Sequence, residues 1–117
     1  MTTFIANGFT PAMLKLPSGV EFKEVGQEEF CQATKHATNS VGHTATIDLI
    51  NQLCGSNLQV NRVSIKADFG DEIYITMVAV RLEEGKVLNS EEVKAMHKEG
   101  KIKFVKAKVY GLEGGEQ

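Results

Sequence analysis

Apolar residues recur along the chain with two spacings, one typical of strands and one typical of helices. Residues 3–6 predict a short strand, and residues 20–25 alternate apolar and polar side chains as a half-buried strand does. Residues 27–37 and 44–54 place apolar side chains three and four positions apart, which predicts helices, and Gly55 supplies a C-terminal stop for the second. The first half of the chain therefore predicts two strands and two helices.

Two β-rich runs flank a turn in the middle of the chain. Residues 61–67 and 73–81 are separated by Asp68-Phe69-Gly70-Asp71, whose residue types favour a turn, so we expect an antiparallel hairpin. The second run is apolar on both alternating faces, as in a strand that is covered on both sides. It is therefore predicted to be a central strand.

A loop, a helix and a last strand follow. Residues 82–88 have the composition of a loop, and the part from Glu83 onward is a candidate lid over a bound ligand. Asn89 and Glu92 have the spacing of a capping box, which predicts a helix that reaches about Lys98. Residues 102–110 predict a last strand, and the Gly- and Glu-rich residues 111–117 predict a disordered tail.

These elements, about five strands and three or four helices in mixed order, predict an α/β (α+β) fold with a mixed sheet and helices packed on it. The chain has 117 residues, of which 42% are hydrophobic and 24% are charged, a composition typical of one globular domain. We therefore expect a single domain over residues 1–110.

The charge balance argues against long nucleic acids as partners. Lys and Arg total 13 while Asp and Glu total 15, so there is no net positive charge to hold a polyanion. Two or three donors in a cleft can still bind a small anion. Because the sequence shows neither a signal-peptide pattern nor an apolar run of membrane-spanning length, we expect a cytoplasmic protein without a membrane partner, in the host cell if a virus encodes it.

The two cysteines, Cys31 and Cys54, both fall inside apolar helical patterns. Buried free thiols are favoured over a disulfide at such positions. The reducing cytosol is then the expected compartment.

His43 is the candidate residue of greatest chemical interest, because it lies with Gly42 at the predicted start of the 44–54 helix. A helix N-terminus attracts anions through its backbone N–H groups and its dipole, and a glycine lets a ligand come close to the backbone. An imidazole, with an ordinary pKa of about 6.5, can act as a general acid beside a phosphodiester. Capping of the helix, shared with Thr44, is the alternative explanation.

Five further residues are candidates for ligand contacts or catalysis from nearby segments. Arg81 ends the predicted central strand and Glu84 lies in the loop after it, so a guanidinium could clamp a phosphate while the carboxylate orients it. Arg62, on the facing strand of the expected hairpin, could add a second cation. Asn7 and Thr10, after the first strand, could contact a base or a ribose. The alternative for Arg81 and Glu84 is a surface loop. For Arg62 it is a surface salt bridge, and for Asn7 and Thr10 it is a turn or a helix cap.

The histidines do not predict a metal site. His36, His43 and His97 fall in different predicted elements, with no carboxylate or thiol at ligand spacing. No glycine-rich phosphate loop with its lysine occurs either. We therefore expect neither a metal nor a cofactor.

Several motifs, taken in order, resemble the viral ring nucleases that act as type III anti-CRISPR proteins. The match covers nearly the whole chain. It rests on Ala6-Asn7-Gly8-Phe9-Thr10, Gly42-His43-Thr44-Ala45-Thr46-Ile47, Ile50-Asn51 with Leu53-Cys54-Gly55, Asn61-Arg62-Val63, and Arg81-Leu82-Glu83-Glu84-Gly85-Lys86. The chain departs from the family pattern at Val80, where the family has Gln, and at Thr44-Ala45, where it has Asp-Ser.

The resemblance implies a homodimer that binds cyclic tetraadenylate across the subunit interface and cleaves it, without metal, to linear diadenylate with a 2′,3′-cyclic phosphate. Such cleavage would neutralise type III CRISPR signalling. In this family pattern His43 is the general acid, Arg81 stabilises the transition state and Glu84 assists by positioning. The implied ligand contacts are Asn7, Thr10, Gly42, Thr46 and Arg62.

The chemistry suits these residue types, because a ribose 2′-hydroxyl already lies beside its phosphorus and needs alignment, charge stabilisation and a proton for the leaving oxygen. Two alternatives stay open from the residues alone. One is a sponge that binds a cyclic oligonucleotide without cutting it, and the other is a small interaction domain.

Overall fold

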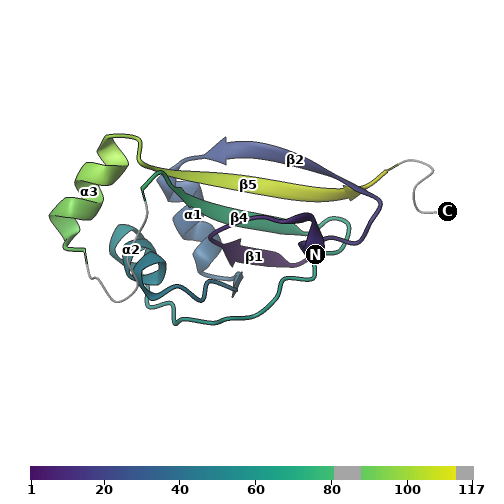
Figure 1. The fold of residues 1–117 in the computed structure, drawn as a ribbon, viewed down its shortest axis with the longest axis horizontal. Coiled ribbons are helices and arrows are strands. Elements are labelled where there is room, and N and C mark those ends of the chain that lie inside the picture. Colours follow the sequence, from purple (N-terminus) through teal and green to yellow (C-terminus); the bar gives the residue numbers. More distant parts are fainter. Residues whose placement is uncertain (81–87, 113–117) are drawn as a thin grey trace.

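A five-stranded mixed sheet with three helices forms the core of the molecule (Figure 1). The computed structural model describes residues 1–80 and 88–112. The elements in chain order are β1 (Thr3–Ala6), the 3-10 helix η1 (Pro11–Met13), β2 (Ser18–Val25), α1 (Gln27–Thr34), β3 (Thr38–Asn39), α2 (Thr44–Cys54), β4 (Glu72–Val78), α3 (Ser90–Lys98) and β5 (Ile102–Gly111).

The strand order is β2-β5-β4-β1-β3. Strand β5 pairs antiparallel with both β2 and β4, while β1 pairs parallel with both β4 and β3. The predicted α+β fold with a mixed, five-stranded sheet is therefore confirmed, and β4 is the central strand that the apolar run predicted.

The three helices pack at one end and on one face of the sheet, where they bury the larger of two apolar cores (Figure 1). Phe30 of α1 stacks on Phe104 of β5, with ring centroids 4.3 Å apart. Leu49 of α2 and Val93 of α3 are also fully buried in this core. The helical spacing of these apolar residues is what turns one side of each helix toward the sheet.

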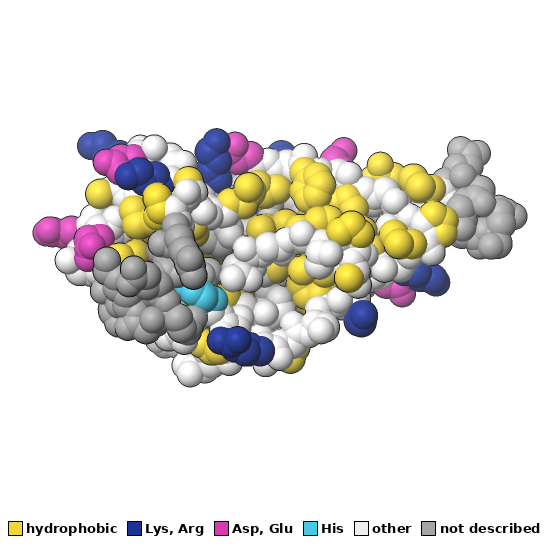
Figure 2. Space-filling view, viewed as in Figure 1, with side chains coloured by type: hydrophobic (Ala, Val, Ile, Leu, Met, Phe, Trp, Pro, Cys, Tyr) yellow, Lys and Arg dark blue, Asp and Glu magenta, His cyan; other side chains and the backbone are white. Residues whose placement is uncertain are grey.

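Among the residues that the structure describes, the opposite face of the sheet is covered at one end only. There η1 and the segment before β4 pack Met13, Leu14 and Ile65 over Ile73 and Val109. The rest of this face stays open, and Figure 2 shows hydrophobic side chains gathered over β2, β5 and β4. Its most exposed members are Phe22, at 55% of its surface, and Met77, at 51%. Over residues 1–80 and 88–112, the sheet therefore presents an apolar face that no other described segment covers.

The predicted hairpin between residues 61–67 and the central strand is wrong. The turn itself exists, because the Asp71 N–H donates to the Asp68 carbonyl at 3.1 Å and Gly70 has a φ of 92°. Both edges of β4 are already paired, one with β1 and the other with β5. Residues 61–67 therefore run as an irregular segment, with one isolated parallel bridge between Leu14 and Ala67.

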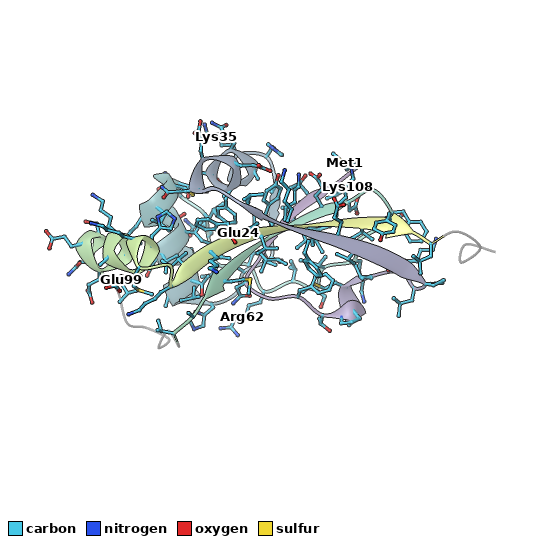
Figure 3. All side chains as sticks on the ribbon, turned by 90° about the horizontal axis from the view of Figure 1, so that it is seen from above. Met1, Glu24, Lys35, Arg62, Glu99 and Lys108 are labelled. Carbon is cyan, nitrogen blue, oxygen red and sulfur yellow. A yellow bond between two sulfur atoms is a disulfide. The ribbon has the colours of Figure 1, made fainter. Side chains whose placement is uncertain are left out.

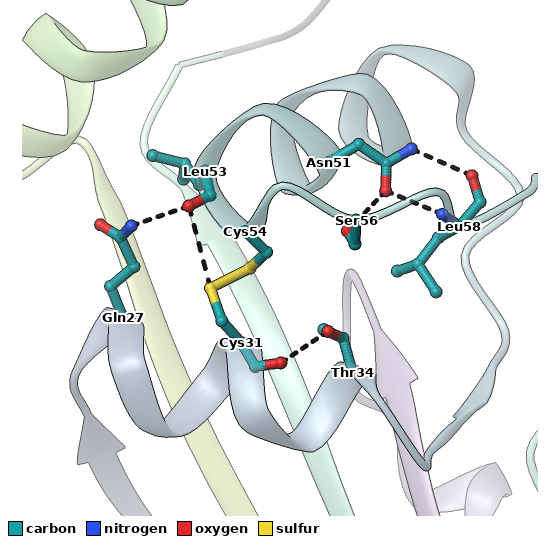
Figure 4. Close-up of a disulfide and its surroundings, with 8 residues drawn as sticks. All are labelled: Gln27, Cys31, Thr34, Asn51, Leu53, Cys54, Ser56 and Leu58. Carbon is teal, nitrogen blue, oxygen red and sulfur yellow. Dashed lines mark hydrogen bonds between the residues drawn. A yellow bond between two sulfur atoms is a disulfide. The ribbon is translucent and has the colours of Figure 1, made fainter.

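The prediction of free thiols is also wrong, because Cys31 and Cys54 form a disulfide that joins α1 to the end of α2 (Figure 4). Their Cα atoms lie 5.2 Å apart. The helical spacing correctly placed both cysteines on core-facing sides, but it could not show that the two sides face each other. The expectation of a reducing compartment rested on free thiols, and the disulfide removes that support.

The side chain of Asn51 holds the chain that leaves α2 (Figure 4). Its amide donates to the Leu58 carbonyl at 3.0 Å, and its Oδ1 accepts from the Leu58 N–H at 2.9 Å and from the Ser56 hydroxyl at 2.7 Å. An irregular segment keeps a defined path when its backbone groups are paired in this way. The segment that carries Arg62 is therefore anchored to α2.

Helix ends follow the predicted signals closely. The capping box of α3 is confirmed, since the Asn89 Oδ1 accepts from the Glu92 N–H at 2.8 Å and the Glu92 carboxylate accepts from the Asn89 N–H at 3.1 Å. Gly55 adopts a left-handed φ of 62° after α2. Helix α1 ends at Thr34, three residues before the predicted end at residue 37.

Two predicted segments fall largely outside the described residues. The candidate lid lies there except for Leu88, and so does the predicted tail from residue 113 onward, whereas Gly111 is the last residue of β5. Within residues 1–80 and 88–112, no helix has the length and apolar character needed to cross a membrane.

Candidate functional site

The site lies where the carboxyl ends of two parallel strands meet the start of a helix. Asn7 follows β1 directly, and Ala79 and Val80 follow β4. Because β1 and β4 are parallel, their carboxyl ends lie at the same edge of the sheet. His43, immediately before α2, lies at this edge too. Open α/β sheets commonly bind ligands at such an edge.

A small hollow of about 180 Å³ lies beside His43. It is lined by Asn7, His43, Thr46, Thr76, Val78 and Val80. One amide, one imidazole and two hydroxyls therefore converge between two apolar valines, with no carboxylate among the described lining residues. This composition suits an anionic group.

His43 itself is the N-cap of α2. Its Nδ1 accepts a hydrogen bond from the Thr46 backbone N–H at 3.3 Å and lies 3.0 Å from the Thr46 hydroxyl. A nitrogen that accepts from an N–H carries no proton, so in the neutral ring this bond fits the tautomer with the proton on Nε2. The capping explanation from the sequence is thus confirmed, with His43 and not Thr44 as the cap.

The Thr46 hydroxyl gives the ring a second option. If the imidazole gains a proton on Nδ1, that N–H can donate to the hydroxyl oxygen, which accepts as readily as it donates. Both protonation states of His43 therefore have a partner at Nδ1, and Nε2 carries a proton in each. Thr46 is 5% exposed, so its side chain is held in place for this role.

Asn7 also lines two other hollows. One, of about 380 Å³, lies between the loop after β1 and the segment before β4, and Phe9, Thr10, Ser40 and Ser64 are among its lining residues. The Thr10 hydroxyl accepts from the Ala12 N–H at 3.4 Å, so Thr10 is the cap of η1 and also borders a hollow. Its capping role is confirmed.

Gly42 makes room for the side chain of Arg62. A Cβ on Gly42 would collide with the Cγ of Arg62, so the glycine lets the arginine stem lie across the backbone just before His43. The prediction that Arg62 sits on a paired strand is corrected, but its proximity to the start of α2 is real. In Figure 3, Arg62 points to the side of the molecule opposite Lys35, the C-cap of α1.

Arg81 and Glu84, the other two predicted catalytic residues, lie outside the described residues. Arg81 follows directly in sequence on Val80, which lines the His43 hollow. The roles assigned to Arg81 and Glu84 therefore stay predictions.

Thr76 is a lining residue that the sequence reasoning missed. It is the polar member of the apolar run Ile73-Tyr74-Ile75-Thr76-Met77-Val78, and its single hydroxyl in a buried strand was the available signal. Among residues 1–80 and 88–112, no group of three or more His, Cys, Asp or Glu side chains could hold a metal ion.

Comparison with known proteins places the chain among viral proteins. It is 42% identical over 115 residues to an uncharacterized protein, ORF116, of Acidianus filamentous virus 1 (isolate United States/Yellowstone), covering 96% of this chain and 99% of that protein. It is 32% identical over 87 residues to uncharacterized protein 26 of Sulfolobus islandicus filamentous virus (isolate Iceland/Hveragerdi), covering 69% and 74%.

The fold also matches a solved structure. B116 of Sulfolobus turreted icosahedral virus superposes with a TM-score of 0.84 at 39% identity, covering 92% of this chain and 99% of that chain. A family model described as STIV B116-like matches residues 3–104. The chain therefore belongs to the STIV B116-like family of viral proteins.

Proposed function

We propose that this protein is a metal-independent ring nuclease, which cleaves cyclic tetraadenylate to linear diadenylate with a 2′,3′-cyclic phosphate. The observation that carries the proposal is the His43 imidazole, held at a helix N-terminus by Thr46 and facing a hollow without carboxylates among its described lining residues. A helix N-terminus attracts a phosphodiester, and an imidazole beside it can supply a proton.

The proposed reaction begins with attack of a ribose 2′-oxygen on the adjacent phosphorus. The P–O2′ bond forms, the P–O5′ bond breaks, and the 2′-hydroxyl proton leaves to solvent. His43 Nε2 gives its proton to the departing 5′-oxygen, and the imidazole then regains a proton from water. One cut opens the ring, and a second on the opposite side yields two dinucleotides, each with a cyclic phosphate and a free 5′-hydroxyl.

Thr46 has a defined part in this proposal. The acid is the imidazolium, and its Nδ1–H donates to the Thr46 hydroxyl while Nε2–H faces the phosphodiester. After transfer, Nδ1 keeps that proton and Nε2 is bare until water reprotonates it. A hydroxyl that can accept from Nδ1 keeps the ring oriented in the charged state.

The remaining roles rest on the resemblance to the viral ring nucleases. Arg81 stabilises the charge of the pentacoordinate phosphorus and Glu84 positions the reacting groups. Arg62, whose stem crosses the backbone at Gly42 next to His43, is assigned to a phosphate of the ring. Asn7 and Thr10 are assigned to a ribose or a base.

The proposal includes a homodimer that forms through the open apolar face of the sheet. A hollow of about 540 Å³ on this face is lined by Asn7, Phe9, Phe22, Met77 and Val105 among others, and it shares Asn7 and Val78 with the His43 hollow. A second copy on this face would bury exposed apolar surface and would wall the site.

Charge supports self-association at this face. By strand register, Glu24 pairs with Val105 and Lys103 pairs with Met77, so one acid and one base border the apolar residues on the same side of the sheet. A two-fold axis can bring the acid of one copy near the base of the other. A ring of four nucleotides, itself two-fold symmetric, would then meet two copies of His43.

The direct test is incubation of cyclic tetraadenylate with excess protein in EDTA, followed by chromatography. We expect the ring to disappear in a single turnover and linear diadenylate to appear. Intact ring with no binding would contradict the proposal. Tight binding without cleavage would replace it with the sponge, a protein that sequesters the messenger.

The dimer has a separate test, because Phe22→Asp places a charge in the centre of the apolar face. We expect this variant to sediment as a monomer while the unmodified protein sediments as a dimer. Lys23→Asp, at the neighbouring residue on the other face of β2, is the matched control and should leave the dimer intact. Sedimentation of the unmodified protein as a monomer would contradict this part of the proposal.

Cleavage of this messenger would give a virus a way to silence type III CRISPR immunity. The membership of this chain in a family of viral proteins supports that role.

A further inference from the structure

Thr76 is buried in the central strand with a hydroxyl that has no hydrogen-bond partner among the described residues. Its side chain is 1% exposed. Ser18, at the start of β2, is the other residue with a buried, partnerless hydroxyl in that part of the chain. Buried polar groups are nearly always paired, so the Thr76 hydroxyl, which lies in the central strand, needs an explanation.

The place of Thr76 in the fold supplies one. Strand register pairs Thr76 with Phe104, whose ring packs beneath the helices, so the Thr76 side chain lies on the helix-covered face of the sheet. There it lines the His43 hollow together with Asn7 and Thr46. The partnerless hydroxyl is therefore part of the wall of the candidate site.

Packing alone does not account for a threonine here. Valine has nearly the same shape and would fill the same space without burying a polar group, and the flanking positions Ile75 and Met77 are apolar. A buried hydroxyl without a partner destabilises the empty protein. A residue of this kind is expected where a ligand supplies the missing bond.

The chemistry of the hollow indicates what that ligand group is. Its polar members can all donate hydrogen bonds, and it lies at the positive end of α2. Such surroundings favour a phosphate oxygen over a cation or a neutral base.

We infer that Thr76 is a phosphate-binding residue, whose hydroxyl donates to a non-bridging oxygen, directly after a small rotation or through one water. The inference rests on the proposed function for the nucleotide that carries this phosphate. Thr76 would then hold the scissile phosphate against His43 from the side of the sheet, while the helix start holds it from above. It is a positioning residue and transfers no proton.

Thr76→Val tests the inference, because it replaces the hydroxyl with a methyl group of similar size. Inorganic phosphate, titrated into the full-length protein and followed by amide NMR with chloride at matched ionic strength as the blank, probes the hollow independently of ring cleavage. We expect the variant to bind phosphate and cyclic tetraadenylate about tenfold more weakly, the loss of one hydrogen bond to a charged group. Thr76→Ser should restore most of the affinity.

The midpoint of unfolding without ligand separates this role from a structural one. We expect Thr76→Val to raise it, because the variant buries no unpaired hydroxyl. Ser18→Ala is the matched control, since Ser18 pairs with Gly111 at the far end of β2 and away from the hollow. It should raise the midpoint as well, yet leave phosphate binding unchanged.

Three results would overturn the inference: no phosphate binding by the unmodified protein, equal affinity in Thr76→Val, or a lower unfolding midpoint in that variant. Its failure is distinct from failure of the proposed function. Phosphate binding that depends on Thr76, in a protein that leaves the ring intact, would uphold the inference and refute the nuclease. Ring cleavage, combined with unchanged affinities of Thr76→Val for phosphate and for the ring, would support the nuclease and refute the inference about Thr76.

Discussion

The two roles of His43 can be separated by substitution, because only one of them requires an imidazole. As the N-cap of α2, its Nδ1 accepts from the Thr46 N–H at 3.3 Å. Asparagine is among the best N-cap residues and places an acceptor oxygen in a similar position, but it cannot act as a general acid. His43→Asn therefore removes the proposed acid and keeps the cap, whereas His43→Ala removes both.

The expected magnitudes differ between the two variants. Loss of an N-cap costs about 1 kcal/mol, which for a domain of this size lowers the unfolding temperature by about 4 °C. His43→Ala should show this loss, and His43→Asn should stay within about 0.5 kcal/mol of the unmodified protein. Loss of a general acid slows the chemical step by about 10²–10⁴-fold, and both variants should show it equally.

The assay pairs thermal unfolding with single-turnover cleavage of cyclic tetraadenylate. Equal loss of cleavage in the two variants, with loss of stability in one, assigns catalysis to the imidazole and not to the integrity of the helix start. Cleavage of the ring by His43→Asn at the rate of the unmodified protein would refute this assignment. Thr46→Val should lower the cleavage rate as well, since it removes the hydroxyl that accepts from protonated Nδ1.

Three other changes test the framework around the site. Cys54→Ser removes the disulfide, which joins residues 23 positions apart, and should lower the free energy of unfolding in denaturant by about 3 kcal/mol. Equal stability of the oxidised and reduced protein would contradict this expectation. Burial, followed by a hydrogen bond to Glu29 and nearby acidic charges, raises the pKa of Tyr74 from 10.0 to about 12. Because the pKa of Tyr74 is higher in the folded state, its neutral hydroxyl contributes about 1–3 kcal/mol to the free energy of unfolding below pH 10, and this contribution is lost as the pH rises towards 12. Tyr74→Phe should not show this loss of stability between pH 10 and pH 12, and identical pH profiles of the two proteins would contradict the prediction. Gly42→Ala should cost about 1 kcal/mol and weaken ring binding, because the new methyl displaces the Arg62 stem, and unchanged ring affinity would remove Arg62 from the site.

Local signals in the sequence predicted much of the fold. The start and end of α2, the capping box of α3 and the central position of β4 each depend on residues close together in the chain. Side-chain capping, a left-handed glycine and a strand apolar on both faces are short-range features. They therefore leave a pattern that a single sequence can show.

Features that depend on long-range packing were not predictable. The irregular path of residues 61–67 follows from the pairing of β1 and β5 with the two edges of β4, which no local pattern encodes. Strand β3 has two residues, too few for any periodicity. The disulfide requires α1 and α2 to face each other at two particular turns, and helical spacing does not specify that contact.

The same division holds for the site. His43 was predictable because its place at a helix start is local, although which side chain caps the helix was decided only by the geometry at Nδ1. The contact between Gly42 and Arg62 joins residues 20 positions apart and was visible only in three dimensions. Thr76 was overlooked because strand periodicity treats it as one more buried position.

The most direct test of the central claim is the chemical identity of the product. Phosphorus NMR and mass spectrometry of cyclic tetraadenylate after single-turnover incubation in EDTA distinguish the possible termini. Attack by the 2′-oxygen with protonation of the 5′-oxygen predicts linear diadenylate that carries a 2′,3′-cyclic phosphate and a free 5′-hydroxyl. An intact ring, or a product with a 5′-phosphate, would contradict the account.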